Sequence, residues 1–379
     1  MENFFSTLLP HNNLPKIALL SPSLVEGDAV SNDVVGMYKI LSKNLFNTKI
    51  FADTSTVSHL QVSHPSKIRS FLSKPSDILV YHHSIGWDYG MELLGNINCK
   101  KVVKYHNVTP PEFYQGICED YASMCRAGRQ QLKNLVDISC DLYLADSQYN
   151  LEELNSISQE ENKGINGSVV FPFHHIDRLQ SVEADIDVLK RFKNDKKVNI
   201  LMVGRLAPNK GYLALISAFN VYHKEYNSNS RLLIVGSQDP RLSKYKEMLD
   251  INIKYWNLQD SIFYLGKVSD KALKSYYLVS DLFVTMSEHE GFCVPLVESM
   301  SMKLPIIAYG STAIPYTLGK AGLIWPEANP CLFAGSVDQI LKDEHLKMGL
   351  GMMGWQRYQE HFTNTSIEKT FMKALQQFL

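Results

Sequence analysis

Two glutamates eight residues apart, Glu290 and Glu298, flank a short loop that leads into a predicted helix. Pro295 favours a first helical turn, so we expect a loop over Gly291 to Val294, with Gly291 free to adopt a positive φ, and a helix from Leu296 to about Met302. Free N–H groups at a helix start attract an anion. Because a carboxylate would repel a phosphate, the glutamates are expected to hold hydroxyl groups such as those of sugars. A solvated acidic helix start explains the same residues equally well.

A second candidate anion site lies upstream, where an apolar run from Val198 to Val203 predicts a buried strand. The loop that follows carries Arg205 and Lys210, five residues apart, between Gly204 and Gly211. Arginine offers a planar fork and lysine a compact charge, so the two can converge on one phosphate pair. A solvated loop is the alternative, but open α/β sheets bind ligands at the carboxyl ends of their strands, which favours the phosphate site.

These segments resemble the retaining glycosyltransferases of family 4. Glu290 to Glu298 is similar to the two-glutamate signature of the family, and Val203 to Gly211 is similar to its diphosphate loop. Four further segments match in the family's order, namely Leu232–Gly236, Phe263–Val268, Ser280–Glu288 and Gly319–Pro326. The match covers roughly residues 198–345. The first half matches more loosely, through Tyr105–Pro110 and Asp141–Ser147. The nearest look-alikes are bacterial enzymes that build surface polysaccharides.

The resemblance implies a GT-B fold, with two Rossmann-like parallel-sheet domains facing each other across a cleft. It also implies roles for individual residues. Glu298 is expected to hold the ribose, and Val268 to meet the base through its backbone. The remaining nucleotide and diphosphate contacts are expected from Gly27, Gly204, Arg205, Lys210, Val294 and Leu296. Donor-sugar contacts are expected from His106, Glu290, Gly291, Phe292 and Cys293. Catalysis is expected to depend on His106, Glu290, Arg205 and Lys210.

The sequence departs from the family pattern at three places. Most members have glycine at the position of Cys293, and many have glutamate at the position of Tyr316. The flexible loop that Gly27 resembles usually carries a doubled glycine, which is missing here. We read Cys293 as a small loop residue rather than a nucleophile, because no basic partner is evident near it.

Histidines follow two predicted strands of the first half. His106 ends the strand Val102–Tyr105 and precedes a turn-forming stretch that would direct it at the cleft. The resemblance gives a histidine at this point a contact with the donor sugar, and a structural histidine is the alternative. His82 and His83 end the strand Ile78–Tyr81, and either could line an acceptor pocket.

Strand-like and helix-like runs alternate throughout, which is typical of parallel α/β layers. A chain of 379 residues exceeds the size at which single cores stop growing, so two domains are expected. We predict an N-terminal acceptor domain over 1–180 and a donor domain over 195–355. The strand Lys16–Leu20 is followed by a predicted loop over residues 21–28. A last helical segment over about 356–379 is predicted to return to the first domain.

Composition limits the partners. A formal charge of −1 argues against a nucleic-acid binder. Six scattered cysteines without a CxxC pair indicate reduced thiols and a cytoplasmic protein. The cluster Phe4-Phe5 with Leu8-Leu9 could touch the inner membrane face, or dock on its own domain. Composition leaves the oligomeric state open.

The resemblance implies a retaining transferase. The two cations can neutralise the diphosphate without an ion, which predicts that the enzyme is metal-independent. It would move a hexose from a nucleotide sugar, with UDP the expected carrier, to a saccharide or lipid-linked saccharide. No cofactor and no metal ligand set is expected. Two alternatives stay open: a GT-B sugar-nucleotide epimerase, and a non-catalytic subunit that binds nucleotide sugars.

Overall fold

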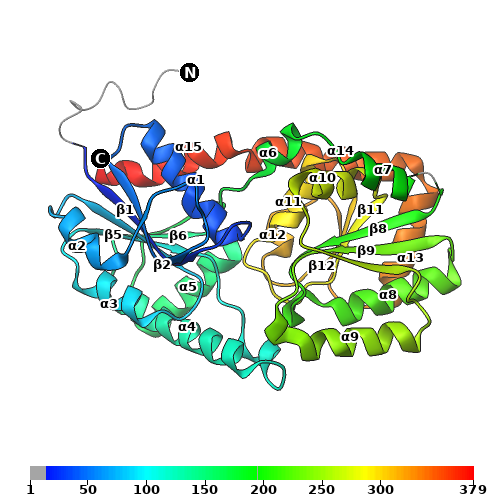
Figure 1. The fold of residues 1–379 in the computed structure, drawn as a ribbon. Helices are drawn as coiled ribbons and strands as arrows, with labels where there is room; N and C mark the ends of the chain where they lie inside the picture. The colour runs from blue at the N-terminus through cyan, green and yellow to red at the C-terminus, as the bar shows by residue number, and fades with distance from the viewer. Residues whose placement is uncertain (1–13, 194) are drawn as a thin grey trace. The chain divides into compact units, whose positions relative to one another are not determined.

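The computed structural model describes residues 14–193 and 195–379, which form two compact units (Figure 1). The first unit comprises the chain up to Pro111 together with Ser123–His174 and Asn364–Leu379. The second unit comprises Glu112–Ala122 and His175–Thr363. The chain therefore leaves the first unit twice and returns to it at its C-terminal end.

The described part of the first unit contains a seven-stranded parallel sheet of order β3-β2-β1-β4-β5-β6-β7. Its strands are β1 (Ile17–Leu24), β2 (Thr48–Ser55), β3 (Val62–Ser63), β4 (Ile78–His83), β5 (Lys100–Tyr105), β6 (Leu142–Ala145) and β7 (Gly167–Val169). Its helices are α1 (Ala29–Lys43), α2 (Ile68–Phe71), α3 (Asp88–Asn96), most of α4 (Glu119–Asp137), α5 (Gln148–Glu160) and α15 (Asn364–Leu375).

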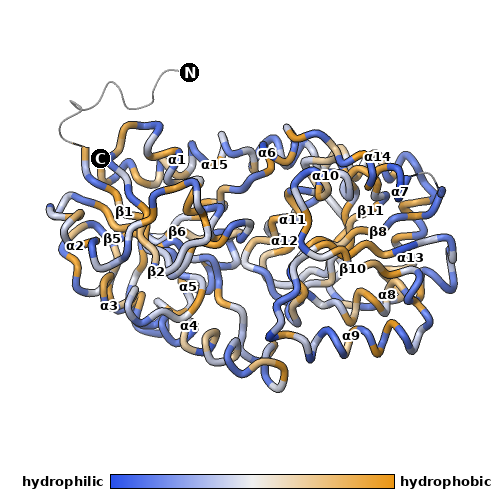
Figure 2. The backbone as a smooth tube through the Cα atoms, viewed as in Figure 1, coloured by the Kyte–Doolittle hydropathy of each residue, from blue (hydrophilic) through white to orange (hydrophobic). Residues whose placement is uncertain are grey.

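The core of the first unit joins β1, β4 and β5 to α1 and α15. The C-terminal helix packs into this core: Phe371 and Leu375 are fully buried, and the ring of Phe371 meets the ring of Phe173 edge-on at a centroid distance of 5.9 Å. Figure 2 shows apolar residues concentrated along the strands, as expected for parallel strands that are covered on both faces. Burial of these rings holds α15 beside α1 (Figure 1).

The described part of the second unit contains a six-stranded parallel sheet of order β10-β9-β8-β11-β12-β13. Its strands are β8 (Val198–Val203), β9 (Ser230–Val235), β10 (Ile262–Gly266), β11 (Leu282–Thr285), β12 (Ile306–Tyr309) and β13 (Leu323–Trp325). Its helices are α6 (Ile176–Ser181), α7 (Ile186–Lys193), α8 (Tyr212–Glu225), α9 (Ser243–Tyr255), α10 (Asp270–Val279), α11 (Val294–Ser301), α12 (Ile314–Leu318), α13 (Pro330–Lys342) and α14 (Glu344–Arg357).

Each sheet has one point at which its strand order reverses, between β1 and β4 in the first and between β8 and β11 in the second. Such switch points open a crevice at the carboxyl ends of the strands, where doubly wound sheets bind ligands. The prediction of a GT-B chain built from two Rossmann-like parallel-sheet domains is confirmed. Ligand-binding sites are therefore expected in the loops after β8 and β11 of the second unit and in those after β1 and β4 of the first.

Several boundaries differ from the sequence predictions. The units divide between His174 and His175 rather than near residue 180, and the returning segment begins at Asn364 rather than at 356. Residues 112–122 belong to the second unit, which was not foreseen. The predicted loop over 21–28 was wrong in part, because β1 continues to Leu24 through its pairing with β2.

Two predictions concern membranes. The cluster at Phe4-Phe5 and Leu8-Leu9 lies outside the described residues. Within the described residues, no helix combines the length and apolar character needed to cross a bilayer.

Candidate functional site

The basic loop of the second unit leaves β8 at the switch point and packs against the loop after β11. Gly211 adopts a left-handed conformation with φ of 64°, and a Cβ there would lie 1.9 Å from the carbonyl oxygen of Met286. Only glycine fits this approach. The amide of Asn209 donates to the carbonyl of His289 at 3.1 Å, and the carbonyl of Asn209 accepts from the N–H of Glu288 at 2.9 Å. These contacts fix the cationic loop against the acidic one.

Lys210 and Glu290, from these two loops, form an ion pair. The Lys210 Nζ lies 2.7 Å and 2.8 Å from the two carboxylate oxygens of Glu290, whose side chain is only 8% exposed. The Thr312 hydroxyl accepts from the N–H of Glu290 at 2.9 Å. The structure thus brings together two residues predicted separately. In the structure Lys210 neutralises Glu290, whereas the sequence pattern predicted that Lys210 contacts the diphosphate.

Arg205 is exposed, at the start of the same loop. Its guanidinium lies 5.8 Å from the ring centroid of Tyr121, and the structure gives it no hydrogen bond or ion pair with the residues it describes. A cation of this kind remains available for a ligand. Gly204, one residue earlier, donates its N–H to Val235 and accepts from the Tyr212 hydroxyl at 2.7 Å, so the base of the loop is rigid.

Helix α11 begins next to Glu290, but the left-handed residue is not the one predicted. Cys293, not Gly291, has φ of 72° and is the N-cap of α11. Most members of the family that this sequence resembles carry glycine at this position. Glycine adopts a positive φ without steric cost, which explains that preference. Leu296 donates its N–H to the Cys293 carbonyl at 3.1 Å, so the predicted diphosphate contact of Leu296 competes with an internal bond. Val294 has no such bond among the described residues.

Glu298 lies inside α11 and is almost completely buried. The Tyr277 hydroxyl donates to one carboxylate oxygen at 2.6 Å, and His175 Nε2 lies 3.7 Å from the other. Burial raises the pKa of Glu298 above its usual range, and His175 and Tyr277 only partly oppose this effect. Tyr277 and His175 were not predicted as partners of Glu298. Val268 follows β10, as expected, and is half-buried.

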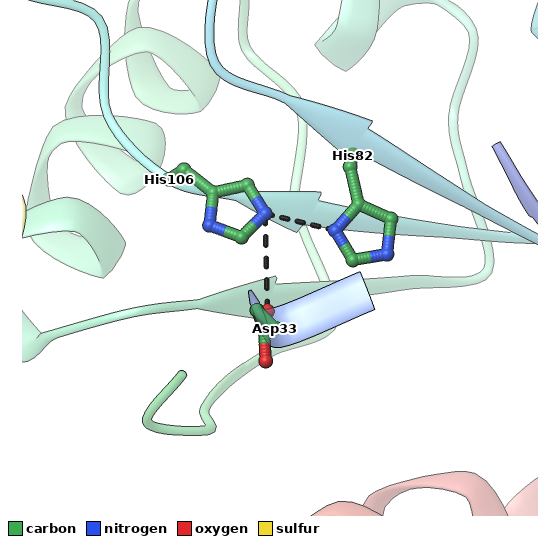
Figure 3. Close-up of side chains that lie close together, drawn as sticks. All are labelled: Asp33, His82 and His106. Atoms are coloured by element: carbon green, nitrogen blue, oxygen red, sulfur yellow. Dashed lines mark hydrogen bonds and ion pairs between the residues drawn. The ribbon is translucent and has the colours of Figure 1, made fainter. Parts of the chain in front are cut away.

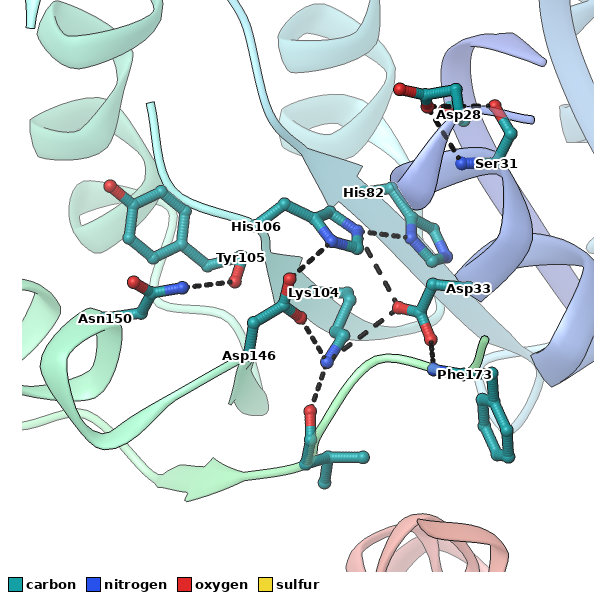
Figure 4. Close-up of polar contacts among 12 residues, drawn as sticks. Asp28, Ser31, Asp33, His82, Lys104, Tyr105, His106, Asp146, Asn150 and Phe173 are labelled. Atoms are coloured by element: carbon teal, nitrogen blue, oxygen red, sulfur yellow. Dashed lines mark hydrogen bonds and ion pairs between the residues drawn. The ribbon is translucent and has the colours of Figure 1, made fainter. Parts of the chain in front are cut away.

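The first unit holds a separate polar cluster. The two ring nitrogens of His106 are both engaged: Nε2 lies 2.9 Å from His82 Nδ1 (Figure 3), and Nδ1 lies 2.9 Å from Asp146 Oδ2 (Figure 4). Lys104 Nζ lies 2.6 Å from Asp146 Oδ1 and 3.8 Å from Asp33 Oδ2, and it also donates to the carbonyl of Val170 (Figure 4). The side chains of these residues are all at most 6% exposed.

Burial and neighbouring charges set the protonation of this cluster. Burial raises the pKa of Asp33 to about 6, although Lys104 and His106 oppose it. Burial would also raise the pKa of Asp146, but His106 and Lys104 outweigh it and hold that pKa below its ordinary value. Burial lowers the pKa of His82 well below the usual range. Asp146 is therefore a carboxylate that accepts from His106 Nδ1–H.

The sequence prediction found only part of this cluster. Asp33, Lys104 and Asp146 were missed, and His82, which was only a weak candidate for an acceptor pocket, has a fully buried ring. Lys104 carried a usable signal, because it interrupts an apolar strand that both faces of a parallel sheet bury, and a buried lysine requires a partner. His83 points elsewhere, with Nε2 at 3.0 Å from the Gly128 carbonyl. Gly27, at φ of 84°, lies on the exposed turn before α1 in the first unit.

Comparison with known proteins identifies the class of the second unit. Residues 185–353 match the family model described as glycosyl transferases group 1. Mannosylfructose-phosphate synthase of Agrobacterium fabrum is 28% identical over 255 residues, which is 65% of this chain and 55% of that protein. O-antigen chain mannosyltransferase B of Escherichia coli is 24% identical over 159 residues, or 42% of this chain and 41% of that protein. The chain thus spans about half the length of these relatives.

Solved structures extend the likeness in fold to nearly the whole chain. Sucrose-phosphate synthase of Thermosynechococcus elongatus superposes with a TM-score of 0.74 at 18% identity, covering 96% of this chain and 98% of that one. HepE of Anabaena, solved with UDP and glucose, gives a TM-score of 0.69 at 14% identity, covering 96% and 99%. The second unit is a domain of the glycosyl transferases group 1 family. The recognition made from the sequence is confirmed at this level, and family 4 stays a prediction.

Proposed function

We propose that the protein is a retaining glycosyltransferase that moves a hexose from a nucleotide sugar, UDP-linked, to a saccharide or lipid-linked saccharide. The observation that supports this proposal most directly is the contact between the loop after β8 and the loop after β11. These two loops hold Arg205, Lys210 and Glu290 at the switch point of the second sheet. Departure of a nucleoside diphosphate leaves charge on the phosphate oxygens, and preorganised cations stabilise that charge. Arg205 supplies one such cation without losing an internal partner.

Hydroxyl recognition falls to the two glutamates in this proposal. Glu298, buried and fixed by Tyr277, would accept from the ribose hydroxyls, while Glu290 would accept from the donor sugar. The charge of Lys210 then serves both Glu290 and the diphosphate. His106, in the first unit, is proposed to contact the donor sugar on the strength of the resemblance alone. The proposed transfer uses no metal or cofactor, and Arg205 together with Lys210 offsets part of the diphosphate charge.

The names of the similar proteins indicate which donor sugars to test first. HepE was solved with UDP and glucose, and two of the curated relatives are named as mannosyltransferases. The role in polysaccharide synthesis follows the capsular and O-antigen names of such relatives. The nucleotide-sugar donor implies a cytoplasmic location, at the inner membrane face if the acceptor is lipid-linked.

A screen of UDP-, GDP- and ADP-linked glucose and mannose tests the proposal. We expect one UDP-sugar to raise the melting temperature and to be slowly hydrolysed, with retention of the anomeric configuration by NMR and no loss on adding EDTA. Release of a sugar with one inverted hydroxyl would support the epimerase instead. Binding of the nucleotide sugar without hydrolysis or transfer to any glycan would support the non-catalytic subunit.

Replacing Glu298 by glutamine is expected to stabilise the free protein at neutral pH while weakening nucleotide binding. The folded protein raises the pKa of Glu298, so it favours the protonated form, and the stability linked to this group falls as pH rises through the folded pKa. Glutamine avoids that cost and still accepts from Tyr277. Loss of a charge-assisted bond should weaken UDP about 10–100-fold.

Thermal melts at pH 4.5 and 7.5, with UDP titrations, measure both effects. The stability gain should shrink at the lower pH, where the wild-type carboxyl is protonated too. Glu247→Gln, an exposed glutamate on α9, is the matched control and should change neither property. Unchanged UDP affinity in Glu298→Gln would remove the ribose contact from the proposal.

A further inference from the structure

The cluster of the first unit brings three metal-ligand side chains together from three different elements (Figure 3). Asp33 lies on α1, His82 near the end of β4, and His106 directly after β5. His106 Nε2 is 2.9 Å from His82 Nδ1 and 3.8 Å from Asp33 Oδ2, and the three ligand atoms lie within 4.8 Å of one another. The cluster flanks the β1/β4 switch point.

The charges of this cluster balance only when one of its imidazoles carries a proton. Asp33 and Asp146 bring two carboxylates, whereas Lys104 brings one ammonium group, which lies 2.6 Å from Asp146 and 3.8 Å from Asp33. With neutral imidazoles, one negative charge is left where water is excluded, and buried uncompensated charge is costly. Asp33 Oδ2 also lacks a hydrogen-bond partner among the described residues. Both observations indicate room for one more cation.

We propose that Asp33 Oδ2, His82 Nδ1 and His106 Nε2 bind one divalent transition-metal ion of the zinc type. Two imidazole nitrogens and one carboxylate oxygen suit zinc and its neighbours, whereas magnesium and calcium prefer oxygen ligands alone. Three protein ligands leave a fourth position for water or an incoming group.

Two of the three ligands have the outer contacts that metal sites use, while His82 Nε2 is buried without a hydrogen-bond partner among the described residues. His106 donates its Nδ1–H to Asp146 at 2.9 Å, which directs the lone pair of Nε2 toward the centre of the cluster (Figure 4). The other oxygen of Asp33 accepts from the N–H of Phe173 at 2.7 Å, so the carboxylate is held with Oδ2 facing the two imidazoles. The orientation of Asp33 and His106 is therefore set before an ion arrives.

Ion binding requires only small movements. Tetrahedral zinc with bonds of about 2.0–2.2 Å places its ligand atoms about 3.3–3.5 Å apart. The two histidine nitrogens, now 2.9 Å apart, must separate slightly, and Asp33 must approach His106 from 3.8 Å. Lys104 can stay on Asp146 and the Val170 carbonyl. Since the ion occupies Nε2 of His106, only the metal-free form can offer that nitrogen to a donor sugar.

Isothermal titration calorimetry of Zn²⁺ binding to the EDTA-treated protein tests the proposal without any substrate. We expect one ion per chain, and no comparable binding of Mg²⁺. Co²⁺ serves as a spectroscopic probe, because its visible absorption is intense in four-coordinate sites and weak in six-coordinate ones. A 1:1 complex with intense bands supports the site.

Variants locate the bound ion. His82→Gln and Asp33→Asn should each weaken binding more than 100-fold, and Asp146→Asn about 10–100-fold, as expected for an outer partner of a ligating histidine. His361→Gln, an exposed histidine of the second unit, is the control and should bind as the wild type does. Circular dichroism checks that each variant folds.

Two outcomes overturn the proposal. One is absence of stoichiometric Zn²⁺ binding by the wild type, in which case a proton supplies the missing charge. The other is binding that folded His82→Gln retains. If the variants do not fold, the Co²⁺ spectrum of the wild type still decides, since weak six-coordinate bands contradict the four-coordinate site that is proposed.

Discussion

Replacing Arg205 by alanine is expected to lower turnover of the nucleotide sugar at least about 100-fold, the typical effect of losing one preorganised donor. The stability of the fold should change little, because Arg205 is exposed and its guanidinium has no hydrogen bond or ion pair with the described residues beyond its approach to the Tyr121 ring. We expect the stability to change by less than about 1 kcal/mol. Steady-state kinetics with the donor found by the screen, and urea unfolding, measure the two effects.

The loss should appear mainly in kcat, because charge on the leaving diphosphate develops during the reaction. Arg205→Lys keeps a charge but loses the planar fork, so an intermediate rate is expected. Lys254→Ala, at the far end of α9, is the control and should match the wild type. Wild-type turnover in Arg205→Ala would show that the leaving group is stabilised elsewhere.

The donor half of the site was predictable because its determinants are local in sequence. The strand β8 is apolar at five of its six residues, the loop after it carries both cations, and strand order places that loop at the switch point. The motif from Glu290 to Glu298 likewise begins directly before a helix whose proline sits in the first turn. Apart from the strand order, each of these features can be recognised within a ten-residue window.

Contacts between distant segments were not predictable in the same way. Lys210 and Glu290 are 80 residues apart, and nothing in either loop reveals that they pair. Gly291 was the residue expected to be free to adopt a positive φ, whereas the structure has that conformation at Cys293. Tertiary structure overrode a local preference in this loop.

The buried cluster of the first unit depends on the sheet as a whole. Asp33, Lys104 and Asp146 lie on three elements, and only the parallel order of β1, β4, β5 and β6 gathers them at one edge. A polar residue on the buried face of a helix, or within a buried strand, signals that a partner exists. It does not identify the partner, which is why the network was missed.

Replacing Lys210 by methionine is expected to lower turnover at least about 100-fold and, unlike the Arg205 change, to destabilise the fold. Methionine keeps the apolar stem of the side chain but leaves the nearly buried carboxylate of Glu290 without its ion pair. An unpaired group of this kind costs about 1–3 kcal/mol, the lower part of the range applying because Lys210 is itself 20% exposed. Urea unfolding and donor kinetics separate the two losses.

The double variant Lys210→Met with Glu290→Gln distinguishes the structural role of the pair from its chemical one. Removing both charges removes the unpaired carboxylate, so stability should return toward the wild-type value, with a coupling energy of about 0.5–3 kcal/mol. Turnover should stay low, because the cation for the diphosphate and the acceptor for the sugar hydroxyls are both missing. If Lys210→Met were as stable as the wild type, the ion pair would carry no folding energy. Recovery of turnover in the double variant would mean that Lys210 acts only by neutralising Glu290.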